Sequence, residues 1–197
     1  MAVAALKTTP LAGLMVNEIT DARNRDFIQC AALLQKAFEL SSEEIHDLAL
    51  KINQGIPAPD EVHLLAVKQG DLVVGCVVFY YLGHVHFGFM ELITTRAEHR
   101  NQGIGSYLYK AMISYLQERI PQLKGMVLEV QNWPLNMEKR KAFFLRQGAI
   151  PLDLGFYPLP AVIKDSGLIF MVHPLKLNFK MDFDTISSLL KNMSSAI

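Results

Sequence analysis

The spacing of hydrophobic residues changes along the chain, and each change predicts a new element. Residues 14–20 have the composition of a short strand. Residues 26–40 instead repeat hydrophobic side chains at helical intervals, as Phe27, Ala31 and Leu34 show. We therefore expect a strand followed by a helix at the start of the folded chain.

A second helix is predicted directly after the first. Ser41 and Glu44 have the spacing of a capping box, in which each side chain bonds the other residue's main-chain N–H. Gly55 stands where a C-terminal cap is expected, because glycine tolerates the conformation that ends a helix. One face of this helix is apolar and carries Ile45, Leu48, Ala49 and Ile52.

Three strands are predicted next. Residues 62–68 and 72–82 are rich in branched and aromatic side chains and are separated by a turn at 69–71. A second turn at 83–86 leads into the apolar run 87–95. Strands joined by short turns pair with their neighbours, so these three predict an antiparallel meander.

The residues after the meander predict two helices and three further strands. Residues 124–130 form an apolar run that follows a long helix, so strand, helix and strand predict a right-handed crossover and a parallel pair. Residues 136–147 predict a helix that ends at Gly148, and residues 149–157 and 168–172 predict the last two strands. The long helix has an apolar stripe of Ile104, Leu108, Ala111, Met112, Tyr115 and Leu116.

Length and composition favour one globular unit. A chain of 197 residues with 51% hydrophobic content can bury a substantial core. We expect a single domain over residues 1–197, with its core at 14–175 and an appendage at 176–197. Within the appendage, residues 182–193 have one apolar helical face, typical of a packing or dimer surface. A monomer or a homodimer is expected.

The charge balance argues against several classes of partner. The 19 basic residues equal the 19 acidic residues, so no net field favours nucleic acid or an anionic membrane. No apolar stretch approaches the roughly 20 residues that cross a bilayer, and the first residues lack a secretory pattern, which favours the cytoplasm. Cys30 and Cys76 lie in apolar segments, typical of buried thiols. His84 and His86 have no third ligand at useful spacing, so no metal site is expected.

The segment between the strand at 87–95 and the long helix has the composition of an anion-binding loop. Its two glycines allow a tight turn and the close approach of a ligand, and the first N–H groups of the helix point outward without partners. A phosphate group suits such a site. The segment consists of Arg100, Asn101, Gln102, Gly103, Ile104, Gly105 and Ser106.

Two motifs in their order along the chain resemble the GNAT superfamily of acyl-CoA-dependent N-acyltransferases. Residues 91–95, followed by the Arg-x-x-Gly-x-Gly pattern at 100–105, are similar to the superfamily's central strand and pyrophosphate loop. Residues 140–149, with an aromatic pair before a glycine, are similar to its later helix. The resemblance extends over residues 14–172, and within the superfamily it is to a bacterial branch whose acceptors are largely unassigned.

This resemblance implies a fold and a donor. The fold is α/β (α+β), with a mixed, mostly antiparallel twisted sheet of about seven strands, about four flanking helices and an extra C-terminal helix. The donor is acetyl-CoA, with CoA as product. Its pyrophosphate would be held by main-chain amides from Asn101 to Ser106 and by the charge of Arg100. Main-chain groups of Ile93 and Thr95 would pair with the pantetheine arm like an added strand, and Phe144 would pack beside that arm.

Glu91 is the candidate general base. Strand alternation predicts Glu91, Ile93 and Thr95 on one face, which places the carboxylate along the ridge that guides the donor. A protonated amine, with a pKa of about 10, must lose a proton before it attacks a thioester. An edge salt bridge or simple acceptor binding by Glu91 remains the alternative. The amide near Ile93 is expected to stabilise the oxyanion.

The aromatic pair departs from the superfamily pattern. Many relatives have a tyrosine that protonates the leaving thiolate at the position of Phe144. Phenylalanine has no proton to give, so water or Tyr157 is the candidate replacement. A tyrosine near a strand end is otherwise a half-buried packing residue.

The leading hypothesis is an acetyl-CoA-dependent N-acetyltransferase that acts by direct attack in a ternary complex. The alternatives are a noncatalytic module that binds CoA or acyl-CoA, and an N-acyltransferase for a longer acyl chain. The acceptor is a small-molecule amine or a peptide amine, and the sequence does not identify it further. The acidic residues at the second helix are interpreted as a solvated helix surface; they are Glu39, Glu43, Glu44 and Asp47.

Overall fold

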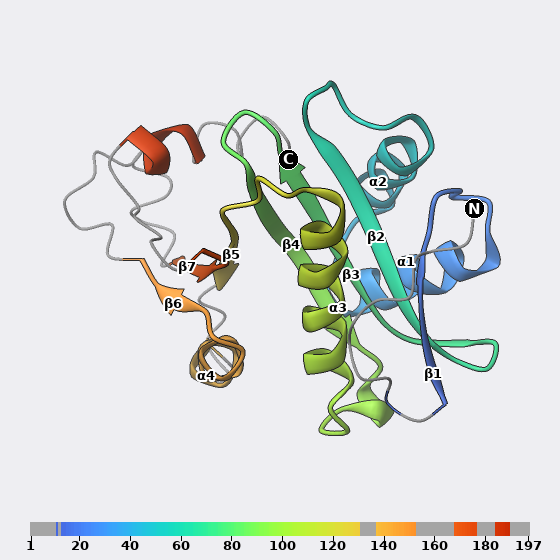
Figure 1. The fold of residues 1–197 in the computed structure, drawn as a ribbon. Helices are drawn as coiled ribbons and strands as arrows, with labels where there is room; N and C mark the ends of the chain where they lie inside the picture. Colours follow the sequence, from blue (N-terminus) through green and yellow to red (C-terminus); the bar gives the residue numbers. More distant parts are fainter. Residues whose placement is uncertain (1–10, 12, 131–136, 153–167, 177–183, 190–197) are drawn as a thin grey trace.

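A seven-stranded sheet with helices on both faces forms the body of the protein (Figure 1). The computed structural model describes residues 11, 13–130, 137–152, 168–176 and 184–189. The first half of the chain contains β1 (Leu14–Glu18), α1 (Arg25–Phe38), α2 (Ser42–Gln54), β2 (Glu61–Gln69), β3 (Leu72–Leu82) and β4 (Phe87–Thr95). The second half contains the short 3-10 helix η1 (Ala97–His99), α3 (Ile104–Arg119), β5 (Gly125–Val130), α4 (Met137–Arg146), β6 (Ile150–Pro151) and β7 (Ile169–Pro174).

The helix signals in the sequence are confirmed. The capping box of α2 is complete, since Glu44 N–H donates to Ser41 Oγ and Ser41 N–H donates to Glu44 Oε2. Gly55 closes the same helix with a bond from its N–H to the carbonyl of Lys51. The entire predicted stripe of α3 is buried. Residues 184–189 are helical and bury Ile186 and Leu189, so the described part of the tail packs on the body.

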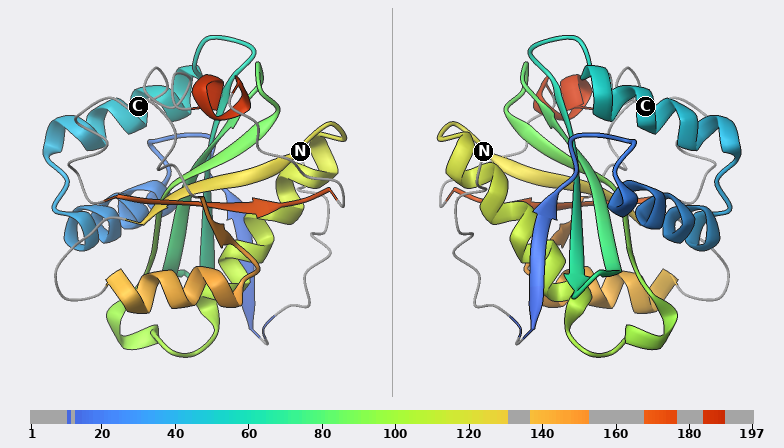
Figure 2. Two further views of the ribbon diagram at one scale, coloured as in Figure 1. Left: turned by 90° about the vertical axis from the view of Figure 1, so that its left-hand side faces the viewer. Right: turned by 90° about the vertical axis from the view of Figure 1, so that its right-hand side faces the viewer.

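The sheet has the order β1-β2-β3-β4-β5-β7-β6. All neighbouring strands are antiparallel except β4 and β5, which are parallel because α3 connects them as a crossover. The predicted mixed, mostly antiparallel fold is therefore confirmed. Figure 2 shows the strong twist of the sheet, with β5 and β7 crossing the direction of β2 and β3.

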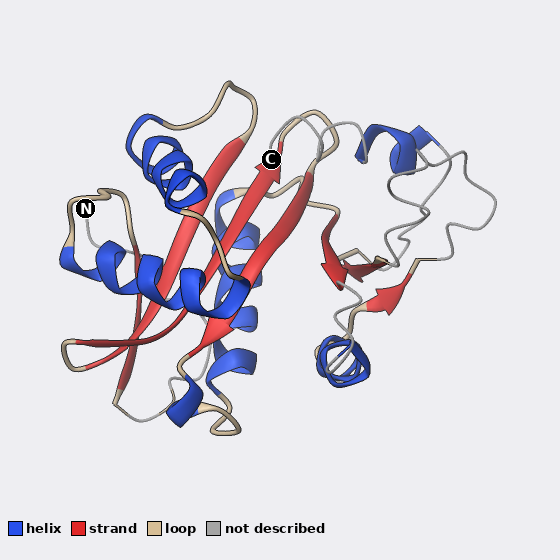
Figure 3. Cartoon of the chain, turned by 180° about the vertical axis from the view of Figure 1, so that it is seen from behind, coloured by secondary structure: helices blue, strands red, loops and turns tan. Residues whose placement is uncertain are grey.

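Two hydrophobic cores lie on opposite faces of the sheet. Helices α1 and α2 cover one face, and α3 covers the other, as the view from behind shows (Figure 3). The first core joins α1 to alternate residues of β3, such as Val78 and Tyr80. The second joins α3 to the residues between them, such as Val77 and Phe79. Cys30 and Cys76 are free thiols buried in the first core, as the sequence predicts.

The pairing of β4 with β5 is short. It begins at Phe87 with Gly125 and ends at Met90 with Leu128. Beyond that point β4 continues along β3, while β5 continues along β7. The sheet thus splits between its two parallel strands, and the second half of β4 has an edge that β5 does not cover.

None of the described helices has the length and apolar character needed to span a bilayer.

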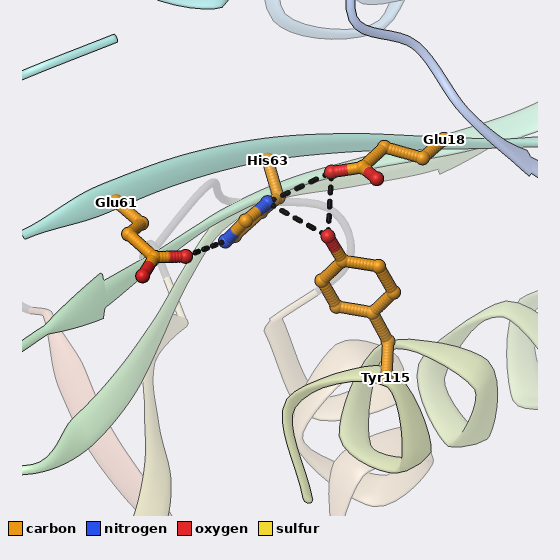
Figure 4. A network of polar contacts seen from close by, with 4 residues as sticks. All are labelled: Glu18, Glu61, His63 and Tyr115. Atoms are coloured by element: carbon orange, nitrogen blue, oxygen red, sulfur yellow. Dashed lines mark hydrogen bonds and ion pairs between the residues drawn. The ribbon is translucent and has the colours of Figure 1, made fainter. Parts of the chain in front are cut away.

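A polar network ties the N-terminal strands to α3 (Figure 4). His63 on β2 is buried, and its two ring nitrogens face carboxylates, with Nδ1 at 3.0 Å from Glu18 Oε1 and Nε2 at 3.1 Å from Glu61 Oε2. A ring nitrogen that carries a hydrogen can donate it to the carboxylate that it faces. The Tyr115 hydroxyl on α3 also donates to Glu18 Oε1, at 2.6 Å. Residues from three elements therefore share one set of hydrogen bonds.

The ionised form of Glu18 is favoured by this network. Burial raises the pKa of Glu18, but hydrogen bonds from His63 and Tyr115, with the charges of His63 and Arg119, outweigh it and hold the pKa below the ordinary 4.5. A depressed carboxyl pKa stabilises the fold at neutral pH. That stabilisation is lost as the pH falls through the depressed value.

We predict that Glu18→Gln lowers the free energy of unfolding at pH 7 by about 1 kcal/mol, because it removes the charged acceptor of two hydrogen bonds. Urea unfolding at pH 7 and at progressively lower pH measures the effect, and the variant and wild type should converge in acid, where Glu18 is protonated. Glu118→Gln is the control, since Glu118 is exposed on α3, the helix that carries Tyr115. A difference that is equal at every pH would contradict the role of the Glu18 charge.

Candidate functional site

A cavity of about 890 Å³ lies where β4 and β5 separate. Its walls come from α1, α2, β3, β4, β5, α4 and the loop before α3. The polar and charged side chains in these walls are those of Glu43, Glu44, Asp47, Lys51, Tyr80, Glu91, Thr94, Thr95, Arg100, Glu129, Lys139 and Arg140. Aromatic side chains in the walls are Phe38, Phe89, Phe143 and Phe144, together with the Tyr80 ring.

The glycine loop forms one end of this cavity. Gly103 is the N-cap of α3 with a φ of 80°, a left-handed conformation that favours glycine. No side chain caps the first turn of the helix. Tyr107 makes the first helical bond to the Gly103 carbonyl, at 2.9 Å, so the amides of residues 104–106 precede the helical ladder. A helix start of this kind binds anions through its N–H groups and its dipole.

Gly105 is not required by the fold itself. A Cβ placed there would lie 3.6 Å from the Phe143 ring and 3.9 Å from the Thr95 methyl carbon, which are ordinary contacts. Gly105 nevertheless lines the cavity. A glycine in a cavity wall gives a ligand close access to the main chain.

The predicted loop residues differ in the groups that they can present to a ligand. Arg100 lines the cavity and is exposed. The Ile104 side chain is buried in the second core, which leaves only its amide for a ligand. Gln102 Nε2 donates to the Glu98 carbonyl at 3.2 Å, and Ser106 Oγ accepts from Gln147 Nε2 at 3.1 Å. Asn101 has a φ of 62° and shapes the turn.

The uncovered edge of β4 faces the cavity. The N–H of Arg96 donates to the Val74 carbonyl on β3, at 2.8 Å. Main-chain groups alternate in direction along a strand, so those of Ile93 and Thr95 point away from β3, toward the side that β5 has left. Both residues line the cavity. Their predicted part in holding a donor matches this geometry.

Glu91 lies in a β-bulge, which changes the faces on which the following residues of β4 lie. Val78 pairs with Leu92 and Phe79 pairs with Met90, so Glu91 has no Cα partner on β3. Leu92 packs on the first core and Ile93 on the second.

The prediction that Glu91, Ile93 and Thr95 share one face is therefore wrong. Glu91 points to the α2 side of the sheet, where it accepts a hydrogen bond from Tyr80, whose ring belongs to the first core. Ile93 pairs with Val77 and Thr95 pairs with Gly75. Val77 and Ile93 both pack in the second core, on the opposite face of the sheet from Glu91. The bulge inserts one residue, and one residue is enough to reverse the alternation.

Glu91 is mostly buried in the wall and has one hydrogen bond to the described part of the chain. The Tyr80 hydroxyl donates to Oε2 at 3.3 Å. Burial raises the pKa of Glu91 above its ordinary value, the Lys51 charge and the Tyr80 hydrogen bond oppose the rise, and Asp47 and Glu44 add to it. A carboxyl with a raised pKa is a stronger base than an ordinary glutamate.

A second carboxyl, which the sequence analysis missed, lies beside the first. Glu129 follows Leu128 at the point where the β4–β5 pairing ends, as Glu91 follows Met90. Burial raises the pKa of Glu129, and the negative charge of Glu91 contributes to the rise. The signal in the sequence was a lone acidic residue inside an apolar strand.

Three acidic residues of α2 also line the cavity, although the sequence analysis interpreted them as a solvated surface. Glu43, Glu44 and Asp47 are exposed, and they face the cavity from one side of the helix. Lys51 is on the same side and pairs with Asp47, with 2.9 Å between Nζ and Oδ2. Their spacing of three to four residues could have shown a common face, but only the fold turns that face toward Glu91.

Phe144 is buried and lines the cavity, with its ring centroid 5.0 Å from that of Phe143 and 5.8 Å from that of Tyr109. Tyr157, the predicted proton donor, lies outside the described residues.

Tyr80 is a cavity hydroxyl that the sequence analysis did not identify, because the apolar pattern of β3 marks it as a core residue. In the described part of the chain, no group of three His, Cys, Asp or Glu side chains gathers as metal ligands.

Comparison with known proteins gives a family match and many structural matches. A sequence profile described as the Acetyltransferase (GNAT) family matches residues 18–148. A search of curated proteins finds no match. The matched range contains the glycine loop and the whole of α3. It also contains Glu91 and Glu129, the two carboxyls at the point where β4 and β5 separate, which we call the strand fork.

Solved structures share the fold at low sequence identity. An acetyltransferase from Streptococcus agalactiae has a TM-score of 0.63 and 14% identity, and the alignment covers 84% of this chain and 100% of that one. A GNAT family acetyltransferase from Elizabethkingia anophelis with acetyl-CoA bound has a TM-score of 0.59 and 19% identity, covering 84% and 100%. An aminoglycoside acetyltransferase from an uncultured soil sample, in complex with sisomicin, has a TM-score of 0.53 and 17% identity, covering 68% and 86%.

The two loop glycines should respond differently to substitution. Gly103→Ala should lower the free energy of unfolding by about 1 kcal/mol, because alanine is strained at a positive φ. Gly105→Ala should leave stability within about 0.5 kcal/mol of wild type, because its Cβ meets only ordinary contacts. Urea unfolding of both variants measures this. A large loss at Gly105 would show that the fold, and not a ligand, requires glycine there.

Proposed function

Because the chain belongs to the Acetyltransferase (GNAT) family, we propose that this acyltransferase moves an acetyl group from acetyl-CoA to a primary amine by direct attack within a ternary complex. One observation carries the proposal. The opening between β4 and β5 has an anion-binding helix start at one end and two carboxyls at its fork. A long donor whose diphosphate binds at the helix start would place its thioester toward the other end of the slot, where the carboxyls can receive the attacking amine.

The donor side is supported by main-chain geometry. The amides of residues 104–106 and the charge of Arg100 suit the pyrophosphate. The uncovered main-chain groups of Ile93 and Thr95 suit the two amides of the pantetheine arm, in the manner of an added strand. Phe144, with its neighbour Phe143, supplies an apolar wall beside that arm.

The acceptor side is supported by charge. Among the described residues, five carboxyl groups line the cavity, from Glu43, Glu44, Asp47, Glu91 and Glu129. An amine arrives largely as an ammonium ion, and carboxylates attract it. Glu91 then takes the proton, directly or through a water molecule, which frees the nitrogen lone pair for attack on the carbonyl carbon. The main-chain N–H at Ile93 is the proposed donor to the oxygen that gains charge.

The leaving thiolate needs little help. A thiol such as that of CoA has a pKa of about 8.5, so its anion leaves readily and can take a proton from water. Phe144 cannot supply that proton. Tyr157 stays a prediction for this role. The single-domain organisation and the cytoplasmic location also stay predictions.

Two observations favour other functions. Phe144 in place of the expected tyrosine favours a module that binds acyl-CoA without turnover. Phe89, Phe143 and Phe144 in the cavity wall favour a donor with a longer acyl chain. The carboxyls at the fork favour catalysis, because a binding module needs no buried base.

We predict that the purified protein releases thiol from acetyl-CoA in the presence of amines, and that Glu91→Gln lowers kcat/KM at neutral pH by about 100-fold or more, because the base is removed. A thiol-reactive dye measures release with a panel of monoamines, diamines and peptide amines. Calorimetry should show unchanged CoA binding by the variant. Glu118→Gln is the matched control, since Glu118 is exposed on α3 away from the cavity.

The alternatives give different results in the same assay. CoA binding without thiol release for any amine would support the module. Faster turnover of longer acyl-CoA donors than of acetyl-CoA would support an N-acyltransferase for a longer acyl chain. Full activity of Glu91→Gln would remove Glu91 as the base.

We also predict that Gly105→Ala weakens CoA binding about tenfold, while its folding stays like that of wild type, because a methyl group enters the cavity wall. Calorimetry with CoA measures the affinity. Gln117→Ala is the control for an alanine on the same helix outside the cavity, since Gln117 is exposed on α3. Unchanged affinity at Gly105 would argue that the diphosphate binds elsewhere.

A further inference from the structure

Tyr80 holds a position in the cavity that apolar packing alone does not explain. Its side chain is 1% exposed and belongs to the first core. Its ring stacks on Phe89 with 6.2 Å between centroids, and Lys51 Nζ lies 5.9 Å from the ring centroid. A phenylalanine would satisfy both ring contacts. The hydroxyl has one described partner of its own, the Glu91 carboxylate.

The contact follows from the alternation of side chains along β4. Tyr80 pairs with Phe89, and Glu91 lies two positions further along β4, on the same face as Phe89. Diagonal neighbours of this kind are within reach of long side chains, and the Tyr80 hydroxyl reaches Oε2 of Glu91. The bulge breaks the alternation only after Glu91, so it places Ile93, and not Glu91, on the opposite face.

The hydroxyl can act only as a donor to this carboxylate. Burial and the negative charge of Glu91 raise the pKa of Tyr80 far above its ordinary value, so Tyr80 keeps its proton at any pH at which the protein works. Oε2 is then occupied as an acceptor. Oε1 has no hydrogen-bond partner among the described residues and stays available to a substrate proton.

We propose that Tyr80 is a positioning residue for Glu91: its hydroxyl fixes the carboxylate through Oε2 and presents Oε1 to the acceptor amine. This inference rests on the proposed function of the same cavity. A hydrogen bond to the charged form also favours ionised Glu91 against the effect of burial. Other charged or titratable groups face Glu91 from the packed elements, namely Glu44, Asp47 and Lys51 of α2 and Glu129 of β5.

Tyr80→Phe separates the hydroxyl from the ring. We expect kcat/KM at neutral pH to fall about tenfold, with the acidic limb of the pH profile moved to higher pH, because Glu91 loses its donor and holds its proton more tightly. The loss should shrink at alkaline pH, where Glu91 is ionised in both proteins. CoA affinity should not change, and most of the effect should appear in kcat.

Tyr81→Phe is the matched control. Tyr81 is the next residue of the same strand, its side chain is in the second core, and its hydroxyl bonds His86 Nδ1 at 2.8 Å. The control removes a hydroxyl of the same kind from the opposite face of β3. The acidic limb of its pH profile should stay at the same pH as in wild type. An equal shift in both variants would mean a general effect of loosening β3 and would overturn the proposal.

A double variant tests whether Tyr80 acts through Glu91. In a Glu91→Gln background, Tyr80→Phe should cause almost no further loss, since no carboxylate remains to position. A further tenfold loss there would overturn the proposal and assign Tyr80 an independent role. If Tyr80→Phe folds poorly, a fluorinated tyrosine at position 80 keeps the ring and strengthens the donor, and should move the acidic limb to lower pH. A limb that stays in place would overturn the proposal.

The failure of this inference differs from failure of the proposed function. If wild type releases thiol but the acidic limb of the pH profile does not move in the Tyr80 variants, the acyltransferase activity is supported and the positioning role of Tyr80 is removed. Absence of thiol release by wild type with every acyl-CoA and amine would remove both.

Discussion

The early end of the pairing between β4 and β5 is the constraint on which the site depends. Hydrogen bonds join the two strands only as far as Met90 and Leu128, and the next residues are Glu91 and Glu129. The split therefore opens a slot and places a carboxyl on each side of its base. It also leaves main-chain groups of β4 without a strand partner, and such groups need another partner, such as an extended ligand. A fully paired sheet would have neither the slot nor the facing carboxyls.

The cavity separates opposite charges, although the chain as a whole is neutral. Arg100 and the α4 residues Lys139 and Arg140 line it, while the acidic side chains come from α2, where Lys51 pairs with Asp47, and from the strand fork. Glu129 feels the charge of Glu91, and Glu91 feels those of Asp47 and Glu44. A donor with phosphates and an acceptor with an ammonium group carry opposite charges. The cavity wall therefore offers each of them a region of the complementary sign.

Local signals in the sequence predicted the elements well, because capping boxes, helical stripes and branched strands act over a few residues. The bounds of β3 and β4 and both caps of α2 agree with the structure. The bulge at Glu91 was not predicted, since it depends on the register between β3 and β4. Tyr80, Glu129 and the acidic face of α2 were missed for the same reason. Each becomes part of the site only through contacts between residues far apart in the chain.

Helix α3 connects the two polar regions of the protein. Near its C-terminus, Tyr115 bonds Glu18, and Arg119 lies over the Tyr115 ring with 4.9 Å to the centroid. Near its N-terminus, its uncapped amides face the cavity. A helix is stiff along its axis, so fixing one end against β1 and β2 also limits the movement of the other. The proposed binding of a diphosphate would gain from this, because N–H groups that are already in place lose less entropy when a ligand arrives.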